Sequence, residues 1–249
     1  MSHQPPHEYV DAHCHVDLFR EPARLVADAA KHQVHTIAVT NAPFVFPHTE
    51  AIARGNPFVH AALGLHPELV ATHGQQLGRF VELLSSTRFV GEVGLDYSTH
   101  DVELRKRQRA VFESILQHCA GARERKVITV HSRRAASDVI AALGAKLPGT
   151  VILHWFTGTL RELEHALAAG VMFSVNSAML SGQSGQRLVR AMPRDMVLTE
   201  SDGPFVGPKT APESPTSMEG TIASLASLWG VEREEAQRTV LANFKRAIR

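Results

Sequence analysis

The chain has 249 residues and a formal net charge of +1, from 26 basic and 25 acidic side chains. This balance excludes a surface that is basic throughout, so a nucleic acid would have to be held by a local site. The two cysteines, Cys14 and Cys119, provide no disulfide framework, and we expect both to pack in the core of a cytoplasmic protein. Residues 1–6 lack a secretory pattern, and no apolar run reaches the roughly 18 residues of a membrane span, so we expect a soluble protein.

Short apolar strands alternate with amphipathic helices along the chain. Strands are predicted at residues 9–17, 34–40, 58–65, 88–93, 127–130, 150–153, 171–175 and 195–199. Helices are predicted at residues 21–33, 47–54, 75–85, 102–123, 135–147, 160–169, 185–192, 217–229 and 232–248. Strict alternation predicts a parallel α/β sheet, and eight units in one chain predict a (β/α)₈ TIM-like barrel, a single domain over residues 1–249. An open doubly wound sheet is the alternative.

The first predicted strand carries a pair of histidines. Side chains alternate between the two faces of a strand, so His13 and His15 project to the same side, together with Asp11. Two imidazoles and a carboxylate at a strand end form half of a metal site. An isolated His-x-His also occurs without a metal, so the positions of the other ligand-type residues decide the interpretation.

Residues of the kinds that bind metals recur where the predicted strands end. They are His13, His15, His66, Glu92, His131, His154 and Asp202. The other ten histidines, His60 among them, are assigned to ordinary surface positions. Since the carboxyl ends of barrel strands surround one centre, we expect the seven residues to meet there.

This set of donors suits two divalent ions (Zn, Mn or Mg), which typically lie about 3.5–4 Å apart in two-metal sites. We assign the first ion to His13, His15 and Asp202, the second ion to His131 and His154, and the bridging position to Glu92. A shared water is the expected nucleophile, and its proton is expected to pass to Asp202 as general base.

Six motifs resemble those of the TatD family of metal-dependent deoxyribonucleases, inside the amidohydrolase-like barrel superfamily. They lie at residues 10–17 (VDAHCHVD), 64–67 (GLHP), 91–97 (GEVGLDY), 130–133 (VHSR), 154–158 (HWFTG) and 200–204 (ESDGP). The resemblance covers nearly the whole chain. It implies a TIM-like barrel, two divalent ions and hydrolysis of DNA phosphodiester bonds, often from a 3′ end.

The chain departs from the usual family pattern at four positions. Ser201 stands where the family usually has Thr, Trp155 replaces a Cys, Val127 replaces a Pro and Ser137 replaces an acid. None of these changes removes a predicted ligand. Together with residues 173–176 (FSVN), these variants resemble the TatD-like member of the four-gene Qat anti-phage cassette, which implies a defence role with partner proteins of the same operon.

Several residues beside the predicted ligands are candidates for binding substrate. His66 is expected to contact a phosphate or water near the ions, with a strand cap as the alternative. Arg133 offers a planar fork to a phosphate oxygen, or else an ion pair to a nearby glutamate. Trp155 and Phe156 are candidates for stacking a nucleobase, with packing in the core as the alternative.

Other polar residues are expected behind the ligands. Glu200 and Asp11 are candidates for orienting a ligating histidine from the second layer of the site. Asn176 is a candidate for lining the site. The Pro-rich segment 207–215 is expected to be a surface loop rather than part of the substrate entrance.

Two other functions stay open. A metal-dependent amidohydrolase or lactonase would act on a small molecule, but many such barrels bridge their metals with a carboxylated lysine, and Glu92 stands at that position here. A non-catalytic subunit of a defence complex is the other alternative, and the complete set of ligands argues against it.

Overall fold

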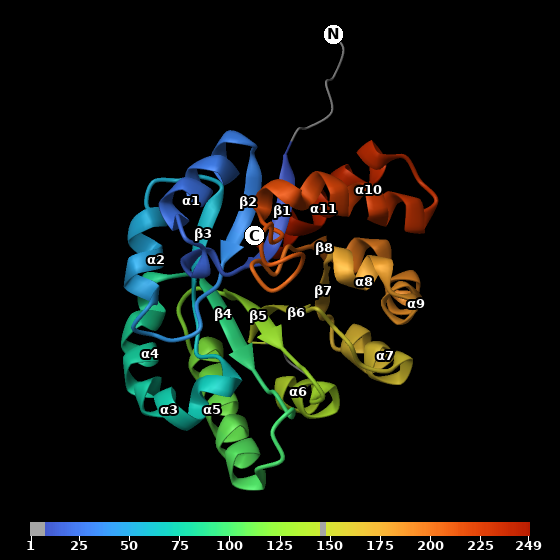
Figure 1. Cartoon of the computed structure of the whole chain (residues 1–249). Coiled ribbons are helices and arrows are strands. Elements are labelled where there is room, and N and C mark those ends of the chain that lie inside the picture. The colour runs from blue at the N-terminus through green and yellow to red at the C-terminus, as the bar shows by residue number, and fades with distance from the viewer. Residues whose placement is uncertain (1–7, 145–147) are drawn as a thin grey trace.

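Eight parallel strands form the centre of the computed structural model, which describes residues 8–144 and 148–249 (Figure 1). The strands are β1 (Tyr9–Cys14), β2 (Val34–Ala38), β3 (Val59–Leu63), β4 (Phe89–Gly94), β5 (Lys126–His131), β6 (Gly149–His154), β7 (Met172–Val175) and β8 (Val197–Thr199). Each strand overlaps its predicted range. Neighbours follow chain order from β1 to β8, without the reversal that a doubly wound sheet requires. The barrel prediction is confirmed.

Hydrogen bonds just beyond β8 and β1 bring the two ends of the sheet together. The amide of Asp202 donates to the carbonyl of His13 at 2.9 Å, and the amide of His15 donates to the carbonyl of Gly203 at 2.9 Å. The ends of the first and last strands therefore lie beside the same opening. This closure brings residues that are about 190 positions apart in the chain into direct contact.

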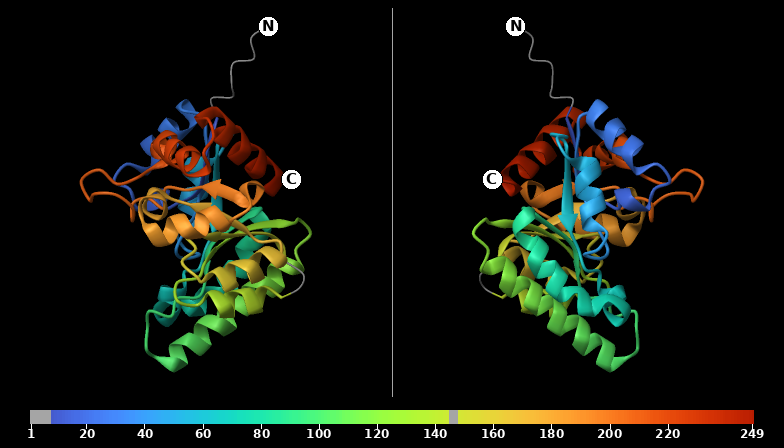
Figure 2. Two further views of the ribbon diagram at one scale, coloured as in Figure 1. Left: turned by 90° about the vertical axis from the view of Figure 1, so that its right-hand side faces the viewer. Right: turned by 90° about the vertical axis from the view of Figure 1, so that its left-hand side faces the viewer.

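Helices form the layer outside the strands (Figures 1 and 2). They are α1 (Pro22–Lys31), α2 (Phe46–Ala53), α3 (Val70–His73), α4 (Leu77–Leu83), α5 (Val102–Ala120), α6 (Ala136–Leu143), α7 (Leu160–Ala168), α8 (Ser177–Ser181), α9 (Gln183–Ala191), α10 (Met218–Trp229) and α11 (Arg233–Ala247). Short 3₁₀ turns include η1 (Val16–Leu18) and η6 (Pro215–Ser217). Helix α11 contacts both β1 and β8 and so covers the seam of the barrel.

Some predicted helices differ from those in the structure. The helix predicted at 135–147 runs as α6, and residues 145–147 lie outside the described part of the chain. Before the helix predicted at 185–192, the structure adds the short helix α8, which Asn176 starts by accepting a hydrogen bond from the Met179 amide at 3.0 Å. A helix of five residues shows no apolar periodicity, so its start is found only from the cap.

Two irregularities in the sheet fall beside predicted ligands. The pairing of β1 with β2 shifts within residues 11–14, and that of β4 with β5 shifts within residues 90–93. Such bulges turn the following side chains away from simple alternation. His13 and Glu92 lie inside these shifted segments, so the bulges direct both side chains toward the barrel mouth.

Packing inside and around the barrel follows the apolar pattern, with one exception. Cys14 and Cys119 are buried in apolar clusters, as predicted. His60, assigned to the surface, instead stacks on Phe89 with ring centroids 4.6 Å apart. No helix in the described ranges is both long and apolar enough to cross a membrane.

Candidate metal centre

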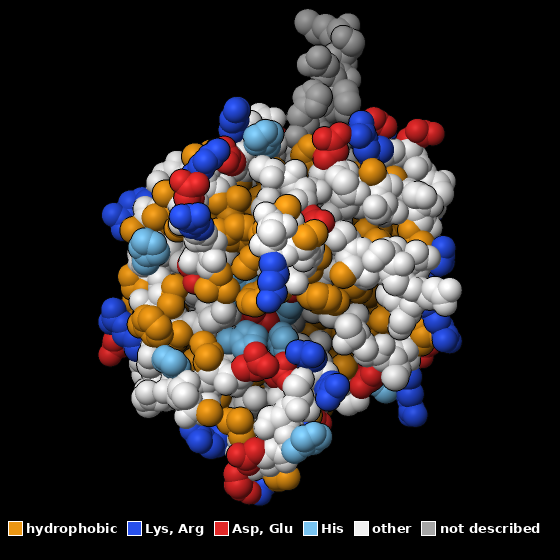
Figure 3. Space-filling model, in the orientation of Figure 1, with side chains coloured by type: hydrophobic (Ala, Val, Ile, Leu, Met, Phe, Trp, Pro, Cys, Tyr) orange, Lys and Arg blue, Asp and Glu red, His pale blue; other side chains and the backbone are white. Residues whose placement is uncertain are grey.

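A pocket of about 420 Å³ opens where the strands end. The described residues that line it are His15, His66, Glu68, Glu92, Asp96, His131, Ser132, Arg133, His154, Trp155, Thr157, Asp202 and Phe205. Figure 3 looks into this opening, with histidines at its centre, apolar side chains above them and charged side chains below. The predicted ligands therefore meet at one site, as the barrel requires.

The two histidines of β1 lie deepest in the site. The Nδ1 atom of His13 is 2.7 Å from the hydroxyl of Thr129 on β5, which leaves Nε2 facing the centre. The Nε2 atoms of His13 and His15 are 3.4 Å apart, and each lies 3.7 Å from Oδ1 of Asp202. The structure thus brings together the three residues assigned to the first ion.

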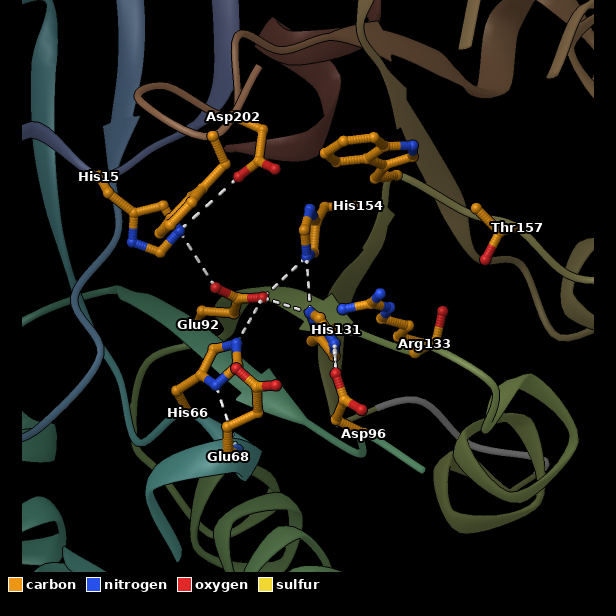
Figure 4. Close-up of a pocket in the computed structure, with 13 residues that line it drawn as sticks. His15, His66, Glu68, Glu92, Asp96, His131, Arg133, His154, Thr157 and Asp202 are labelled. Carbon is orange, nitrogen blue, oxygen red and sulfur yellow. Dashed lines mark hydrogen bonds and ion pairs between the residues drawn. The ribbon is translucent and has the colours of Figure 1, made fainter. Parts of the chain in front are cut away.

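Glu92 lies between two groups of imidazoles (Figure 4). Its Oε2 atom is 3.5 Å from Nε2 of His13 and 3.2 Å from Nε2 of His15. Its Oε1 atom is 2.6 Å from Nδ1 of His131 and 2.8 Å from Nε2 of His154. The two oxygens of one carboxylate therefore face different histidine pairs, as a bridging ligand must.

The spacing of these donor atoms fits a metal ion. Bonds of about 2.0–2.2 Å place the ligands of a tetrahedral ion about 3.3–3.6 Å from one another. Nitrogen and oxygen atoms of His13, His15, Glu92 and Asp202 are separated by 3.2 to 3.7 Å. Around the other Glu92 oxygen, nitrogen atoms of His131 and His154 lie at the hydrogen-bond distances of 2.6 and 2.8 Å, and Nε2 of His66 lies at 3.3 Å.

Asp96 belongs to the site although the sequence reasoning gave it no role. Its Oδ2 atom lies 2.8 Å from Nε2 of His131, so the ring is held with Nδ1 toward Glu92. The Ser98 amide donates to Asp96 Oδ1 at 2.7 Å, and the Asp96 amide donates to Gln108 of α5 at 3.1 Å. Its place in the motif at 91–97, just past a strand end, was the available signal.

Glu200 is buried beside His154, where the sequence places a supporting acid. It accepts hydrogen bonds from the Trp155 amide at 3.1 Å, from Asn176 Nδ2 at 2.9 Å and from the hydroxyl of Ser174. The Nδ1 atom of His154 lies 3.9 Å from Glu200 Oε1. Asn176, expected to line the site, instead binds this carboxylate, and the three donors engage Glu200 outside the pocket.

Asp11, a candidate for orienting a ligating imidazole, contacts the main chain of His13 and Ser201. Its carboxylate accepts hydrogen bonds from the amide and the hydroxyl of Ser201 at 2.9 and 2.6 Å, and from the His13 amide at 3.3 Å. The bulge that follows Asp11 breaks the alternation on which the expectation depended. Asp11 therefore joins the main chain of β1 to the segment that carries Asp202, and burial raises its pKa to about 7.

Burial and charge also set the protonation of the ligands. Burial opposes ionisation of Glu92, but the surrounding imidazoles hold its pKa well below the ordinary value. Burial lowers the pKa of His13 well below its usual range, which favours the neutral ring that a metal needs. Burial raises the pKa of Asp202 well above its usual range, and neighbouring carboxylates add to this shift.

The predicted substrate-binding residues occupy different places. His66 Nε2 lies 3.3 Å from Glu92 Oε1, next to the cluster. Arg133 lines the pocket, and within the described part of the chain its guanidinium forms no ion pair, so the alternative of a salt bridge is not observed. Trp155 lines the pocket, whereas Phe156 is fully buried in the core and is not available for stacking.

Besides Asp96, four residues of the pocket wall had no predicted role, namely Glu68, Ser132, Thr157 and Phe205. The rings of Phe205 and His15 are T-shaped, with centroids 5.1 Å apart. The Glu68 amide, in a short 3₁₀ turn, donates to His66 Nδ1 at 3.2 Å. All four stand past a strand end, where sequence periodicity carries no signal.

A (β/α)₈ barrel with clustered histidines and carboxylates at its mouth defines a metal-dependent hydrolase, and the chain is an enzyme of this class. Residues 10–249 match the family model described as TatD related DNase, so the chain belongs to this family.

Individual relatives agree with this assignment. The chain is 27% identical over 254 residues to the human (Homo sapiens) protein named deoxyribonuclease TATDN3, which covers 94% of this chain and 92% of the relative. It is 27% identical over 179 residues to the 3′-5′ ssDNA/RNA exonuclease TatD of Pantoea vagans, 68% of each chain. The crystal structure of YjjV, a TatD homologue from Escherichia coli, has the same fold, with a TM-score of 0.84, 24% identity and coverage of 96% and 97%.

Proposed function

We propose that the chain hydrolyses DNA phosphodiester bonds with two divalent ions (Zn, Mn or Mg), removing nucleotides from a 3′ end in the cytoplasm. The observation that carries the proposal is Glu92, whose two oxygens face two separate groups of imidazoles. Membership of the TatD related DNase family supports the substrate. The name of the Pantoea relative supports the polarity.

The residues that would hold the ions are His13, His15 and Asp202 for one, His131 and His154 for the other, and Glu92 for both. Two bound ions would neutralise the scissile phosphate and lower the pKa of a water near them towards about 7. Asp202, which lies 3.7 Å from His13 and His15, would be placed to accept the proton of that water.

On the substrate side, Arg133 and His66 bind phosphate oxygens. The guanidinium of Arg133 forms no ion pair in the described part of the chain and can offer two parallel donors to a phosphate. The pocket volume of about 420 Å³ is that of a site for one small ligand. This size favours one terminal nucleotide over an uninterrupted duplex.

The test is the cleavage of end-labelled single-stranded DNA, duplex DNA and RNA, beside a panel of lactones. Glu92→Gln and Asp202→Asn should lower DNA cleavage at least about a hundredfold, with the fold retained by circular dichroism. The matched control is Glu82→Gln, since Glu82 is an exposed acid of α4 that pairs with Arg79. Undiminished cleavage by Glu92→Gln contradicts the proposal.

The same panel separates the alternatives. Hydrolysis of a lactone with no cleavage of nucleic acid supports the amidohydrolase or lactonase function. A metal-loaded protein that cleaves none of these substrates supports the non-catalytic subunit.

We extend the proposal to anti-phage defence with partner proteins of the same operon, on the resemblance to the Qat cassette. Ser174 and Asn176, within the segment that carries this resemblance, both donate to Glu200 beside His154. Cells that express the chain with its operon neighbours should resist phage, and Glu92→Gln should abolish the resistance. Equal plaque counts with and without the chain contradict the extension.

A further inference from the structure

Exposed apolar side chains gather on one side of the pocket mouth. The large exposed apolar residues of the described ranges are Leu18, Phe44, Val102 and Phe205, with exposed fractions of 45, 60, 59 and 59%. Three of these four follow the ends of β1, β2 and β8, which are neighbours in the ring. We call Leu18, Phe44 and Phe205 the apolar rim. Single exposed apolar residues are ordinary, whereas a group beside a pocket indicates a binding surface.

The loops of the apolar rim follow strands that are neighbours in the ring. Strand β1 pairs with β2, and the turn η6, in the connection after β8, contacts both. The amide of His15 also donates to Gly203, two residues before Phe205. In Figure 3 apolar side chains lie above the central histidines, with a Lys or Arg side chain among them.

Phe205 joins the apolar rim to the candidate metal centre. Its ring meets the ring of His15 edge-on, at an interplanar angle of 86°. Its amide donates to the carbonyl of Asp202 at 2.8 Å, which fixes the loop beside a predicted ligand. The Phe205 ring is therefore in contact with a predicted ligand while 59% of the residue stays exposed.

Phe44 offers a second flat surface on the same side. Its ring stacks on His73 with centroids 5.5 Å apart and an interplanar angle of 23°, and 60% of the residue is exposed. The pocket is also lined by Ser132, Arg133, Trp155 and Thr157. Figure 4 shows Arg133 and Thr157 across the pocket from His15, the residue that Phe205 contacts. The mouth therefore carries both an exposed aromatic ring and a cation for phosphate.

We propose that the apolar rim is a stacking platform for the unpaired bases of the substrate strand. The base next to the scissile phosphate stacks on Phe205 and the following base lies against Phe44, while Arg133 holds a phosphate. The proposal rests on the proposed function, and it assigns the recognition of bases to the loops after β8 and β2. Bases in a duplex have both faces covered by their neighbours, so the platform selects single strands.

Nucleobases fit this surface better than a partner protein does. Phe205 belongs both to the apolar rim and to the wall of the pocket. A protein seated on the apolar rim would therefore cover the entrance to the candidate metal centre. A strand whose end enters the pocket can instead lie against this surface without blocking it, since Phe205 both lines the pocket and is exposed.

The experiment measures binding of the metal-loaded protein to fluorescent phosphorothioate oligodeoxythymidylate, which resists cleavage, and to an abasic strand of the same length and linkages. Phe205→Ala should weaken binding of the thymidylate strand roughly 5- to 100-fold and leave binding of the abasic strand unchanged. Phe205→Trp should restore binding. Phe44→Ala should give a smaller loss, and Val102→Ala, the exposed residue outside the apolar rim, should give none.

Two results would overturn the platform. An equal loss on both strands means that Phe205 supports the phosphate site, and no loss on either strand means that the apolar rim serves another partner. If the wild type shows the expected binding pattern but cleaves no DNA, the proposed function fails and the platform stands. If it cleaves DNA while all variants bind alike, the platform alone fails.

Discussion

Two histidines of the candidate metal centre are held through the nitrogen that faces away from the cluster. Thr129 contacts Nδ1 of His13, and Asp96 contacts Nε2 of His131. A partner on the outer nitrogen fixes the tautomer and the direction of the ring, and a charged partner also raises the basicity of the ligand. Residues that touch no substrate therefore determine where the metal-binding lone pairs point.

Asp96→Asn tests this role, because it keeps the size of the side chain and removes its charge. We expect the affinity of the ion held by His131 to fall about 10- to 100-fold, with little change at the other ion. Competition with a chelator measures both affinities. Asp28→Asn, at an exposed acid of α1, is the control, and wild-type affinities in Asp96→Asn would contradict the positioning role.

His60 makes stability depend on pH. Its Nε2 atom is buried without a hydrogen-bond partner, and burial lowers its pKa to about 4. The unfolded chain, with a histidine pKa of about 6.5, binds this proton at higher pH, so stability is lost as pH falls from about 6.5 to 4. When the pH is lowered from 7 to 5, the free energy of unfolding should fall less in His60→Leu than in the wild type. The difference should be about 1–2 kcal/mol, a figure that allows for the partial exposure of His60.

Urea unfolding at the two pH values measures this difference. His165→Leu, at an exposed position of α7, controls for the loss of a histidine elsewhere. An identical loss in the wild type and in His60→Leu would show that another group causes the pH dependence.

The ligands were predicted from one feature, their position at the carboxyl end of a predicted strand. The structure brings them together at that end of the barrel. Asp96 also stands just past a strand end, but its contact with His131 appears only in the folded chain. Phe205 lies farther along the loop after β8, where no periodicity operates. The bulge after Asp11 cannot be read from alternation. His60 was misjudged because the rings that cover it are distant in sequence.

At the scale of elements, the segments at the ends of β2, β3 and β4 lie so close together that Gly64 has no room for a side chain. A Cβ atom on Gly64, just after β3, would lie 1.6 Å from the Thr40 carbonyl and 2.6 Å from the Glu92 amide. Both obstacles are backbone atoms, which cannot rotate away. The glycine therefore lets the segments after β2 and β3 pack against the bridging residue.

Gly64→Ala should destabilise the fold by more than about 2 kcal/mol, since the overlap with backbone forces the strand ends apart. The affinity for metal should fall with it. Gly78→Ala is a matched control, because a Cβ there meets nothing within 4 Å and α4 gains a better helix former. Thermal unfolding compares the two variants, and equal stability would contradict the packing argument.

At the scale of the whole molecule, the proposed donors come from five strands of one ring. They stand at or just past the ends of β1, β4, β5, β6 and β8, and hydrogen bonds just beyond β8 and β1 bring the first and last together. A cluster assembled in this way exists only in the folded barrel, so metal binding is linked to folding.

Removal of metal should therefore lower the melting temperature. At a free-ion concentration of 100 to 1,000 times the dissociation constant, a bound ion adds about 3–4 kcal/mol to the free energy of unfolding. In a chain of this size this corresponds to a rise in melting temperature of roughly 6–16 °C. Calorimetry with and without a chelator measures the shift, and elemental analysis should find two ions per chain. Glu92→Gln should show a smaller shift, and a melting temperature insensitive to chelation would contradict the link.

The order in which the ring is completed has a consequence during synthesis. Asp202 is the last donor to leave the ribosome, and α11, which packs over the seam, follows it. A nascent chain that has not yet exposed these segments lacks Asp202 and the helix over the seam, so the proposed ion site is incomplete. We therefore expect metal-dependent activity only once translation is nearly finished.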